Sequence, residues 1–305
     1  MLIDSASMYF RAFYGVPDSV TAPNGMPVNA VRGFTDMIAT LITRYHPDRF
    51  VACLDNDWRP AFRVALVPSY KAHRVARPTP SGQPDIEEIP DLLVPQVPIL
   101  LAVLKAAGLC ALGVDGFEAD DVIATLAARA DDAGRQVDVV SGDRDLIGVV
   151  TDHVRLLYTG RGVAKLEELT PAAVQAKYGI PSGLYPDFAV LRGDPSDGLP
   201  GVAGIGEKTA AIAVTKHGPI EDILALARAG DPVMSPAIRT KVLASQDYLE
   251  VAPAVVRGRT DLPIGELDDA LPRADADPEM LDALGVEFGL TSSIERLRAA
   301  IATIV

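Results

Sequence analysis

Five carboxylates gather in two tight clusters within residues 114–146. They are Glu118, Asp120 and Asp121 in the first cluster, and Asp143 and Asp145 in the second. The residues between the clusters show helical spacing and then a short apolar run that suits a buried strand. We therefore expect the acids at a helix start and a strand end, on the edge where open α/β sheets bind ligands. Either cluster alone is equally typical of a helix start or a turn.

Further acids follow other predicted strands, which strengthens the prediction of a site. Asp4 ends the first short strand, Asp55 follows the apolar run Arg49–Leu54, and Asp194 and Asp197 lie in a later loop. Two carboxylates 4 Å apart repel by ~4 kcal/mol at an effective dielectric near 20, so nine in one cleft require cations. Because no His or Cys accompanies them, we expect Mg²⁺ or Mn²⁺ rather than zinc. Two such ions about 4 Å apart would suit phosphoryl displacement.

A basic stretch, Arg59–Arg77, contains no acid. Its charged residues can neutralise phosphates, and its Tyr70 can stack on a base. They are Arg59, Arg63, Lys71, Arg74 and Arg77. The Pro-rich connection Pro78–Pro84 and four acids within residues 85–91 follow, which favours a lid or arch over the site. The alternative for this stretch is a solvated surface loop. Arg11, near the N-terminus, could face a ligand at the sheet edge, and its alternative is a solvated face.

The segment 199–206, LPGVAGIG, precedes a predicted helix over Glu207–His217. This pattern predicts a helix-hairpin-helix in which Gly204 and Gly206 allow close backbone approach and the helix amides face an anion. With Lys208 and Thr209, such a hairpin would grip one phosphate of duplex DNA without reading bases.

Bulk composition limits the classes of protein. The chain has 305 residues, 49% of them hydrophobic, and no apolar stretch long enough for a membrane span. It shows no secretory signal, and Cys53 and Cys110 fit buried thiols in a reducing compartment. The net charge of −13 argues against a nucleic-acid partner. Without the nine acids it becomes −13 + 9 = −4, so a polyanionic substrate is not excluded.

Several motifs together resemble one family. They are LIDSAS with YFRAFY, VACLDND, FRVALVPSYKAHR, GFEADDVIATLA, VVSGDRDL and RGDPSDGLPGVAGIGEKTA. Their order resembles that of the bacterial 5′-nucleases, which occur as the N-terminal domain of DNA polymerase I and as stand-alone exonucleases, and are related to flap endonucleases. The resemblance implies a PIN-like α/β nuclease core over residues 1–185, with a mostly parallel central sheet and a helical arch at about 59–98. It also implies a helical DNA-binding region over 186–305, with a helix-hairpin-helix at 194–217.

The resemblance also implies roles for individual residues. Asp4, Asp55, Glu118 and Asp120 match ligands around a first divalent metal ion, and Asp143, Asp145, Asp194 and Asp197 match a second group. Asp121 matches an acid that acts through water. Tyr70, Lys71 and Arg74 match arch residues that engage the scissile phosphate and a neighbouring base. The hairpin 201–206 resembles one that binds K⁺ or Na⁺ through backbone carbonyls, here those of Val202 and Ile205. Ser5 departs from the glycine that is usual after the first aspartate.

The function implied is that of a metal-dependent, structure-specific 5′-3′ exonuclease or 5′-flap endonuclease. Expected partners are DNA with 5′ ends, flaps or gaps and RNA–DNA primer junctions, with a functional link to DNA polymerase I. We expect a monomer in the cytoplasm, associated with the nucleoid. One alternative is a non-catalytic DNA junction-binding protein on the same fold, which would not need the complete acid set. The other is a PIN-class RNase, which would lack the hairpin within Leu199–Ala210.

Overall fold

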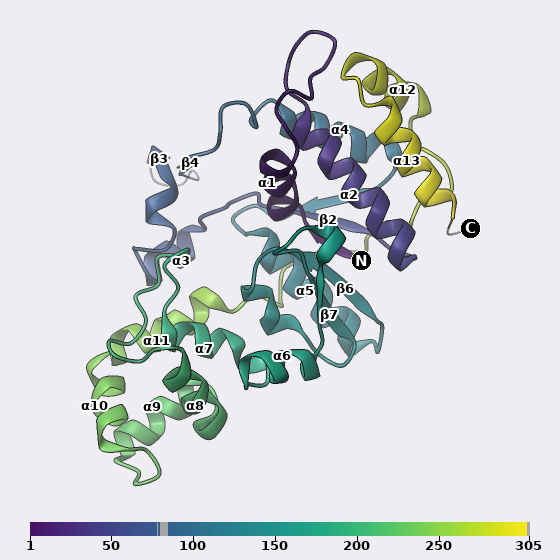
Figure 1. Ribbon diagram of the computed structural model, residues 1–305. Helices are drawn as coiled ribbons and strands as arrows, with labels where there is room; N and C mark the ends of the chain where they lie inside the picture. Colours follow the sequence, from purple (N-terminus) through teal and green to yellow (C-terminus); the bar gives the residue numbers. More distant parts are fainter. Residues whose placement is uncertain (78, 80–84, 304–305) are drawn as a thin grey trace.

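The computed structural model describes residues 1–77, 79 and 85–303. These residues form a six-stranded sheet in the order β5-β2-β1-β6-β7-β8 (Figure 1). All neighbouring pairs are parallel except β7 and β8. The strand bounds are β1 Leu2–Asp4, β2 Val51–Leu54, β5 Cys110–Gly113, β6 Val137–Ser141, β7 Val154–Tyr158 and β8 Glu167–Leu169. The predicted mostly parallel α/β sheet is confirmed.

Alternating side chains of the central strands enter two separate cores. Ile3 and Val140 pack with the helices on one face, whereas the adjacent Leu2 and Val139 pack on the other. This alternation follows from the period of two in a strand, and burial on both faces explains why the strands are almost wholly apolar. The first face is covered by α1 Ser5–Gly15, α2 Asn29–Tyr45 and α4 Gln96–Ala107. The second is covered by α5 Ala119–Asp132 and the 3₁₀ turn η2 Asp145–Val149.

A helical lobe follows the sheet in the chain and lies at the lower left of Figure 1. It is joined to the sheet region by α6 Pro171–Tyr178 and the turn η4 Ser182–Leu184, whereas the turn η3 Val163–Lys165 connects β7 to β8 within the sheet region. The helices of the lobe are α7 Tyr185–Arg192, α8 Glu207–His217, α9 Ile220–Ala229, α10 Pro236–Ala244 and α11 Gln246–Val256. The last two helices, α12 Pro278–Glu287 and α13 Thr291–Ala302, return to pack against α4 and α2. They therefore belong with the sheet's helical layer and not with the lobe, although both were predicted within one region over 186–305.

The segment predicted as a helical arch contains little helix among its described residues. It holds the short helix α3 Ala61–Leu66, the turn η1 Ala72–Arg74 and a hairpin of β3 Val75–Arg77 with β4 Ile86–Glu87. Pro90 and Pro95 precede the return helix, which begins at Gln96, and Pro98 lies in its first turn, where no amide donor is needed for the helix. The connection predicted over Pro78–Pro84 falls, apart from Thr79, outside the described residues. We call residues 59–98 the arch segment.

Among the described residues, none of the helices has both the length and the apolar character needed to cross a membrane.

Candidate active site

Five segments of the chain bring their carboxylates to the carboxyl edge of the sheet. Asp4 is the last residue of β1 and caps α1, accepting a hydrogen bond from the Ser7 amide at 3.0 Å. Its other oxygen accepts one from the Ser141 hydroxyl at 2.5 Å. Asp4 is therefore the cap of α1. Asp55 follows β2 and accepts a hydrogen bond from the Ala119 amide at 2.7 Å.

The remaining acids come from the start of α5, the loop after β6 and the loop after α7. Glu118 caps α5, and Asp120 lies in the first turn of that helix. Asp143 accepts a hydrogen bond from the Asp145 amide at 2.9 Å, so the two residues form one turn. Asp194 accepts bonds from Ser196 and pairs with Arg192 at 3.1 Å. The parallel strand ends thus gather acids that lie far apart in the sequence, as predicted.

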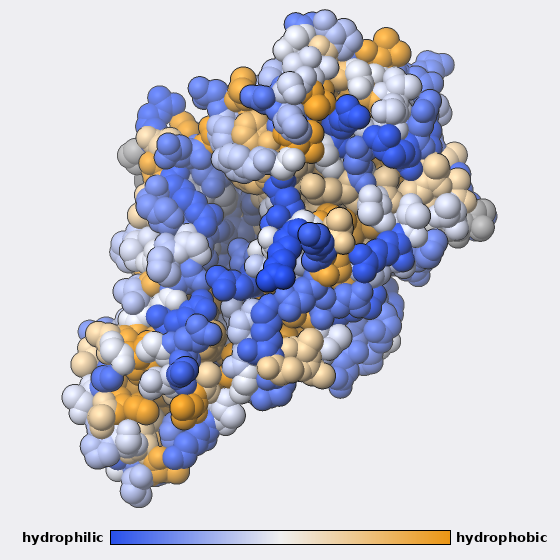
Figure 2. Space-filling model, in the orientation of Figure 1, coloured by the Kyte–Doolittle hydropathy of each residue, from blue (hydrophilic) through white to orange (hydrophobic). Residues whose placement is uncertain are grey.

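These side chains line one cleft of about 350 Å³. In Figure 2 the surface is recessed between the arch segment and α1. Lys71 and Arg74 of the arch segment line the same cleft. The carboxylates that line it are Asp4, Asp55, Glu87, Glu118, Asp120, Asp143, Asp145 and Asp194. Glu87 was missed by the sequence analysis, because it reaches the cleft through the β3–β4 pairing, for which the local sequence has no signal.

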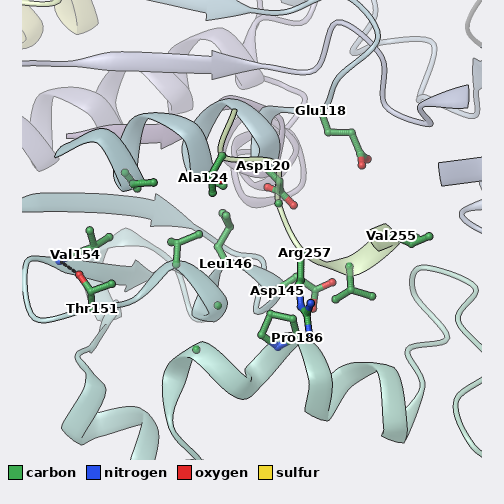
Figure 3. Close-up of a pocket in the computed structure, with 18 of the residues that line it drawn as sticks. Glu118, Asp120, Ala124, Asp145, Leu146, Thr151, Val154, Pro186, Val255 and Arg257 are labelled. Carbon is green, nitrogen blue, oxygen red and sulfur yellow. Dashed lines mark hydrogen bonds between the residues drawn. The ribbon is translucent and has the colours of Figure 1, made fainter. Parts of the chain in front are cut away.

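A second cavity of about 300 Å³ lies behind the acids (Figure 3). Glu118 and Asp120 of α5 lie near one end of it, and Thr151 and Val154 lie near the other. Asp145 and Asp197 also line this cavity, and apolar side chains such as Leu146 and Pro186 form its walls. Glu118, Asp120 and Asp145 line both hollows, so these three acids stand between the cleft and the cavity behind it.

Burial and mutual repulsion make the acids hard to ionise. Burial and the Asp55 carboxylate raise the pKa of Asp4 to about 7. Burial and the Asp143 carboxylate raise the pKa values of Asp120 and Asp145 well above the ordinary range. Burial and Glu118 raise the pKa of Asp55. Like charges in a low-dielectric site have this effect, and a cation between them would relieve it.

Cations of the protein itself already balance part of this charge. Glu118 accepts hydrogen bonds from Lys71, from Arg63 and from the Tyr70 hydroxyl, the last at 2.7 Å. Burial disfavours the charged ammonium of Lys71, but the facing Glu118 carboxylate outweighs it and raises the lysine pKa well above its usual value. Asp197 pairs with Arg74 at 3.3 Å.

The donor set fits divalent cations in its chemistry. Every donor is a carboxylate oxygen, which Mg²⁺ and Mn²⁺ prefer, and the repulsion described above calls for positive charge. Within residues 1–77, 79 and 85–303, however, no three acidic, His or Cys side chains are close enough together to hold an ion as they stand. Glu118, Asp194 and Asp197 are each paired with a lysine or arginine of the chain.

The structure places three residues where they cannot play their predicted roles in this conformation. Arg63, predicted to contact DNA, is 2% exposed and pairs with Glu118 and Asp121, so that prediction is wrong for this conformation. Tyr70 is 4% exposed and turned inward to Glu118, so its ring is not available to a base here. Asp121 is fully buried, and its oxygens accept from Arg63 and from the Glu118 and Arg259 amides. It anchors α5 and does not line the cleft.

The predicted DNA contacts outside the cleft are placed at the surface or the sheet edge. Arg11 lies beside Gly142, next to the Asp143 turn, and its buried Nε has no hydrogen-bond partner among the described residues. Gly204, Gly206 and Lys208 are exposed on the hairpin before α8, and Thr209 is half-buried. Val202 O accepts a hydrogen bond from the Ile205 amide at 2.9 Å, and Lys241 Nζ donates to Gly204 O at 2.7 Å. The helix before this hairpin is α7, which ends at Arg192, well before the glycines.

Two family models cover most of the chain. Residues 1–179 match the 5′-3′ exonuclease N-terminal resolvase-like domain, and residues 180–279 match the 5′-3′ exonuclease C-terminal SAM fold. The chain belongs to the 5′-3′ exonuclease family. The two models meet near the boundary predicted at 185/186, which itself stays a prediction.

Two relatives that match this chain over almost their whole length are named 5′-3′ exonuclease. The "5′-3′ exonuclease" of Mycobacterium tuberculosis (strain ATCC 25618 / H37Rv) is 52% identical over 100% of this chain and 98% of its own length. That of Streptomyces coelicolor is 51% identical over 97% and 98%. DNA polymerase I of Mycobacterium bovis is 39% identical over 89% of this chain but only 28% of the polymerase. The chain is therefore a nuclease of the exonuclease type, as the sequence predicted.

Solved structures support the fold. The T5 D15 protein co-crystallised with metal ions matches with a TM-score of 0.65 at 17% identity, over 100% of this chain and 98% of that one. Human GEN1 in complex with Holliday junction DNA matches with a TM-score of 0.62 at 14% identity, over 97% and 70%. The predicted PIN-like, flap-endonuclease type of α/β fold is confirmed.

Proposed function

We propose that this nuclease is a metal-dependent, structure-specific enzyme that hydrolyses DNA near a 5′ end or at a 5′ flap. The observation that carries the proposal is the cleft in which carboxylates from separate segments of the chain face Lys71 and Arg74. Acids alone would repel a phosphodiester, and cations alone would only bind it. Their opposition in one cleft is suited to holding a phosphate over a metal-ligating surface.

The ligand groups would be Asp4, Asp55, Glu118 and Asp120 on one side and Asp143, Asp145, Asp194 and Asp197 on the other. Bound there, two divalent ions would supply an activated water and neutralise charge on the phosphate. Lys71 and Arg74 would leave their acidic partners and hold the phosphate oxygens. Water adds to phosphorus, the bond to the 3′ oxygen breaks, and that oxygen leaves as a hydroxyl. The products carry a 5′-phosphate and a 3′-hydroxyl.

The hairpin before α8 would hold the duplex beside the cleft. The exposed Gly204, Gly206 and Lys208 would receive one phosphate, and K⁺ or Na⁺ on the carbonyls of Val202 and Ile205 would strengthen that contact. Substrates would include RNA–DNA primer junctions, in line with relatives named DNA polymerase I. Structural neighbours that are described in complex with DNA also favour a DNA substrate. The enzyme would act as a monomer at the nucleoid, in the cytoplasm.

The test compares a 5′-labelled flap duplex with single-stranded RNA, each with Mg²⁺, Mn²⁺ or EDTA. The proposal predicts metal-dependent cutting of the flap near its junction, a ligatable 5′-phosphate on the downstream product, and little cutting of the RNA. Tight flap binding without cutting in any metal would favour a junction-binding protein. Preferential cutting of the RNA would favour a PIN-class RNase.

A further inference from the structure

A second hollow lies on the carboxyl edge of the sheet, beyond the acidic cleft. Its volume is about 650 Å³. It is formed by the turn after β6, the end of β7, the turn η3, the start of β8 and the end of α6. The charged and aromatic side chains that line it are Arg144, Arg161, Lys165, Lys177, Glu167, Tyr158 and Tyr178. We call it the basic hollow.

The charge of the basic hollow is opposite to that of the chain. Four cations and one anion line it, whereas the whole chain carries a net charge of −13. Only one of these cations has an acidic partner in the hollow, since Lys177 pairs with Glu167 at 2.6 Å. The exposed side chains of Arg161 and Lys165 form no hydrogen bond or ion pair with any residue of the described chain. Two cations kept free on an acidic protein favour a polyanionic ligand.

The hollow adjoins the acidic cleft. Arg144 and Tyr158 line both, and Arg144 stands between the candidate ligands Asp143 and Asp145. A chain of phosphates held in the cleft would therefore meet Arg144 first, and then Arg161 and Lys165. Figure 2 shows hydrophilic residues gathered over the middle of the face that carries the cleft.

The aromatic residues give the hollow a firm, partly apolar floor. Tyr158 and Tyr178 are half-buried, and the Lys177 ammonium lies 5.7 Å and 5.4 Å from their ring centroids. Such contacts hold the lysine in place without neutralising it. The floor is therefore preorganised, while Arg161 and Lys165 at its rim remain free to bind phosphate.

We propose that the basic hollow binds the phosphate backbone of the substrate strand where it continues beyond the acidic cleft. The inference rests on the proposed function, because it assigns a second contact to the same nucleic-acid substrate. A strand held at both places would be fixed in direction across the acids, so the hollow would serve affinity and register and not the chemical step.

The test measures flap-DNA binding in EDTA, where no cutting can occur, by fluorescence anisotropy over a range of salt concentrations. The variant is Arg161→Ala with Lys165→Ala. The control is Lys105→Ala with Arg135→Ala, which removes two exposed cations that also lack a side-chain partner in the described chain and lie outside the cleft and the hollow. Loss of two phosphate contacts should reduce the slope of log affinity against log salt by about 1.4 and weaken binding roughly tenfold or more at 0.1 M salt. The control should match the parent.

The outcomes separate the two levels of the proposal. If the parent binds and cuts the flap but the hollow variant binds as the control does, the basic hollow is not a phosphate site while the proposed function stands. If the parent neither binds nor cuts the flap in Mg²⁺, both fail. A photo-crosslinker on Lys165→Cys should mark the substrate strand at a fixed position relative to the cut, and scattered or absent adducts would also overturn the inference. Thermal unfolding of each variant excludes misfolding as the cause.

Discussion

The guanidinium of Arg63 joins three elements at one buried point. It extends from α3, bonds Glu118 and Asp121 at the start of α5, and donates from Nε to Val255 O in α11 at 2.8 Å. The same Glu118 carboxylate receives Lys71 and Tyr70 from farther along the arch segment. One arginine therefore fixes the base of the arch segment to the acidic helix and to the helical lobe.

Arg63→Met should destabilise the protein by about 3–5 kcal/mol, because it leaves the buried Asp121 without a cationic partner and removes one of the two cations that bond Glu118. Arg296→Met is the matched control, since Arg296 pairs with Asp36 in a setting where its side chain is 48% exposed. Such a pair contributes about 1 kcal/mol or less. Urea denaturation measures both. Equal losses in the two variants would show that the Arg63 junction does not hold these elements together.

The raised pKa of Asp4 predicts a pH dependence of stability in the metal-free protein. Its pKa is about 7 in the folded chain, against 3.8 for an ordinary aspartate. Between these values the folded state holds the extra proton, so the free energy of unfolding should fall as the pH rises from about 4 to about 7. In EDTA the melting temperature should therefore be lower at pH 8 than at pH 5.5, and Mg²⁺ should recover more of it at pH 8. A metal-free melting temperature that rises over this range would contradict the described crowding of the acids.

At the scale of elements, the turn before α8 depends on Gly201. Its φ is +68°, and a Cβ there would lie 2.5 Å from the Gly193 amide nitrogen and 2.7 Å from the Arg192 carbonyl. Gly206 has φ −93° and open space around its Cβ position. Packing within the loop therefore requires a glycine at position 201, whereas the space at Gly206 is open to the duplex that we propose binds there.

Gly201→Ala should lower the free energy of unfolding by more than about 1 kcal/mol, because the backbone must shift to relieve both clash and strain. It should also weaken duplex binding in EDTA. Gly206→Ala should leave stability unchanged and weaken duplex binding alone. Denaturation and anisotropy on the same preparations check both claims. A Gly201→Ala variant as stable as the parent would contradict the packing role of Gly201. A Gly206→Ala variant with full duplex affinity would contradict a duplex contact at Gly206.

The elements that the sequence predicted well are those with a local signal. The apolar run between the two acidic clusters forms the predicted strand, Val137–Ser141, and the helix Glu207–His217 matches its predicted bounds. The arch segment was predicted less well. Arg63 and Tyr70 turn inward because their hydrogen-bond partners, Glu118 and Asp121, lie 48 to 58 residues later in the sequence. No local pattern distinguishes a basic residue that binds phosphate from one that forms a buried ion pair.

At the scale of the whole molecule, the chain returns to its sheet region after the helical lobe. Helices α12 and α13 complete the layer begun by α2 and α4, and Leu281, Leu297 and Ile301 share a core with Ile3 and Phe34. The sequence predicted the carboxyl edge of the sheet as the site, because parallel strands end there together. It did not predict this return, since amphipathic helices show which face is buried but not the surface that buries it.

Flap cleavage by the parent, Asp145→Asn and Asp152→Asn in Mg²⁺ tests most directly whether the cleft holds a metal-dependent centre. Asp145 lines both the cleft and the cavity behind it, whereas Asp152 is exposed and lines neither. The account predicts that Asp145→Asn folds normally, binds the flap in EDTA, and cuts at least about 100-fold more slowly, a loss of roughly 2.7 kcal/mol of transition-state stabilisation. Asp152→Asn should cut as the parent does. Parental cutting by Asp145→Asn, or undiminished cutting by the parent in EDTA, would contradict a metal-dependent centre in this cleft.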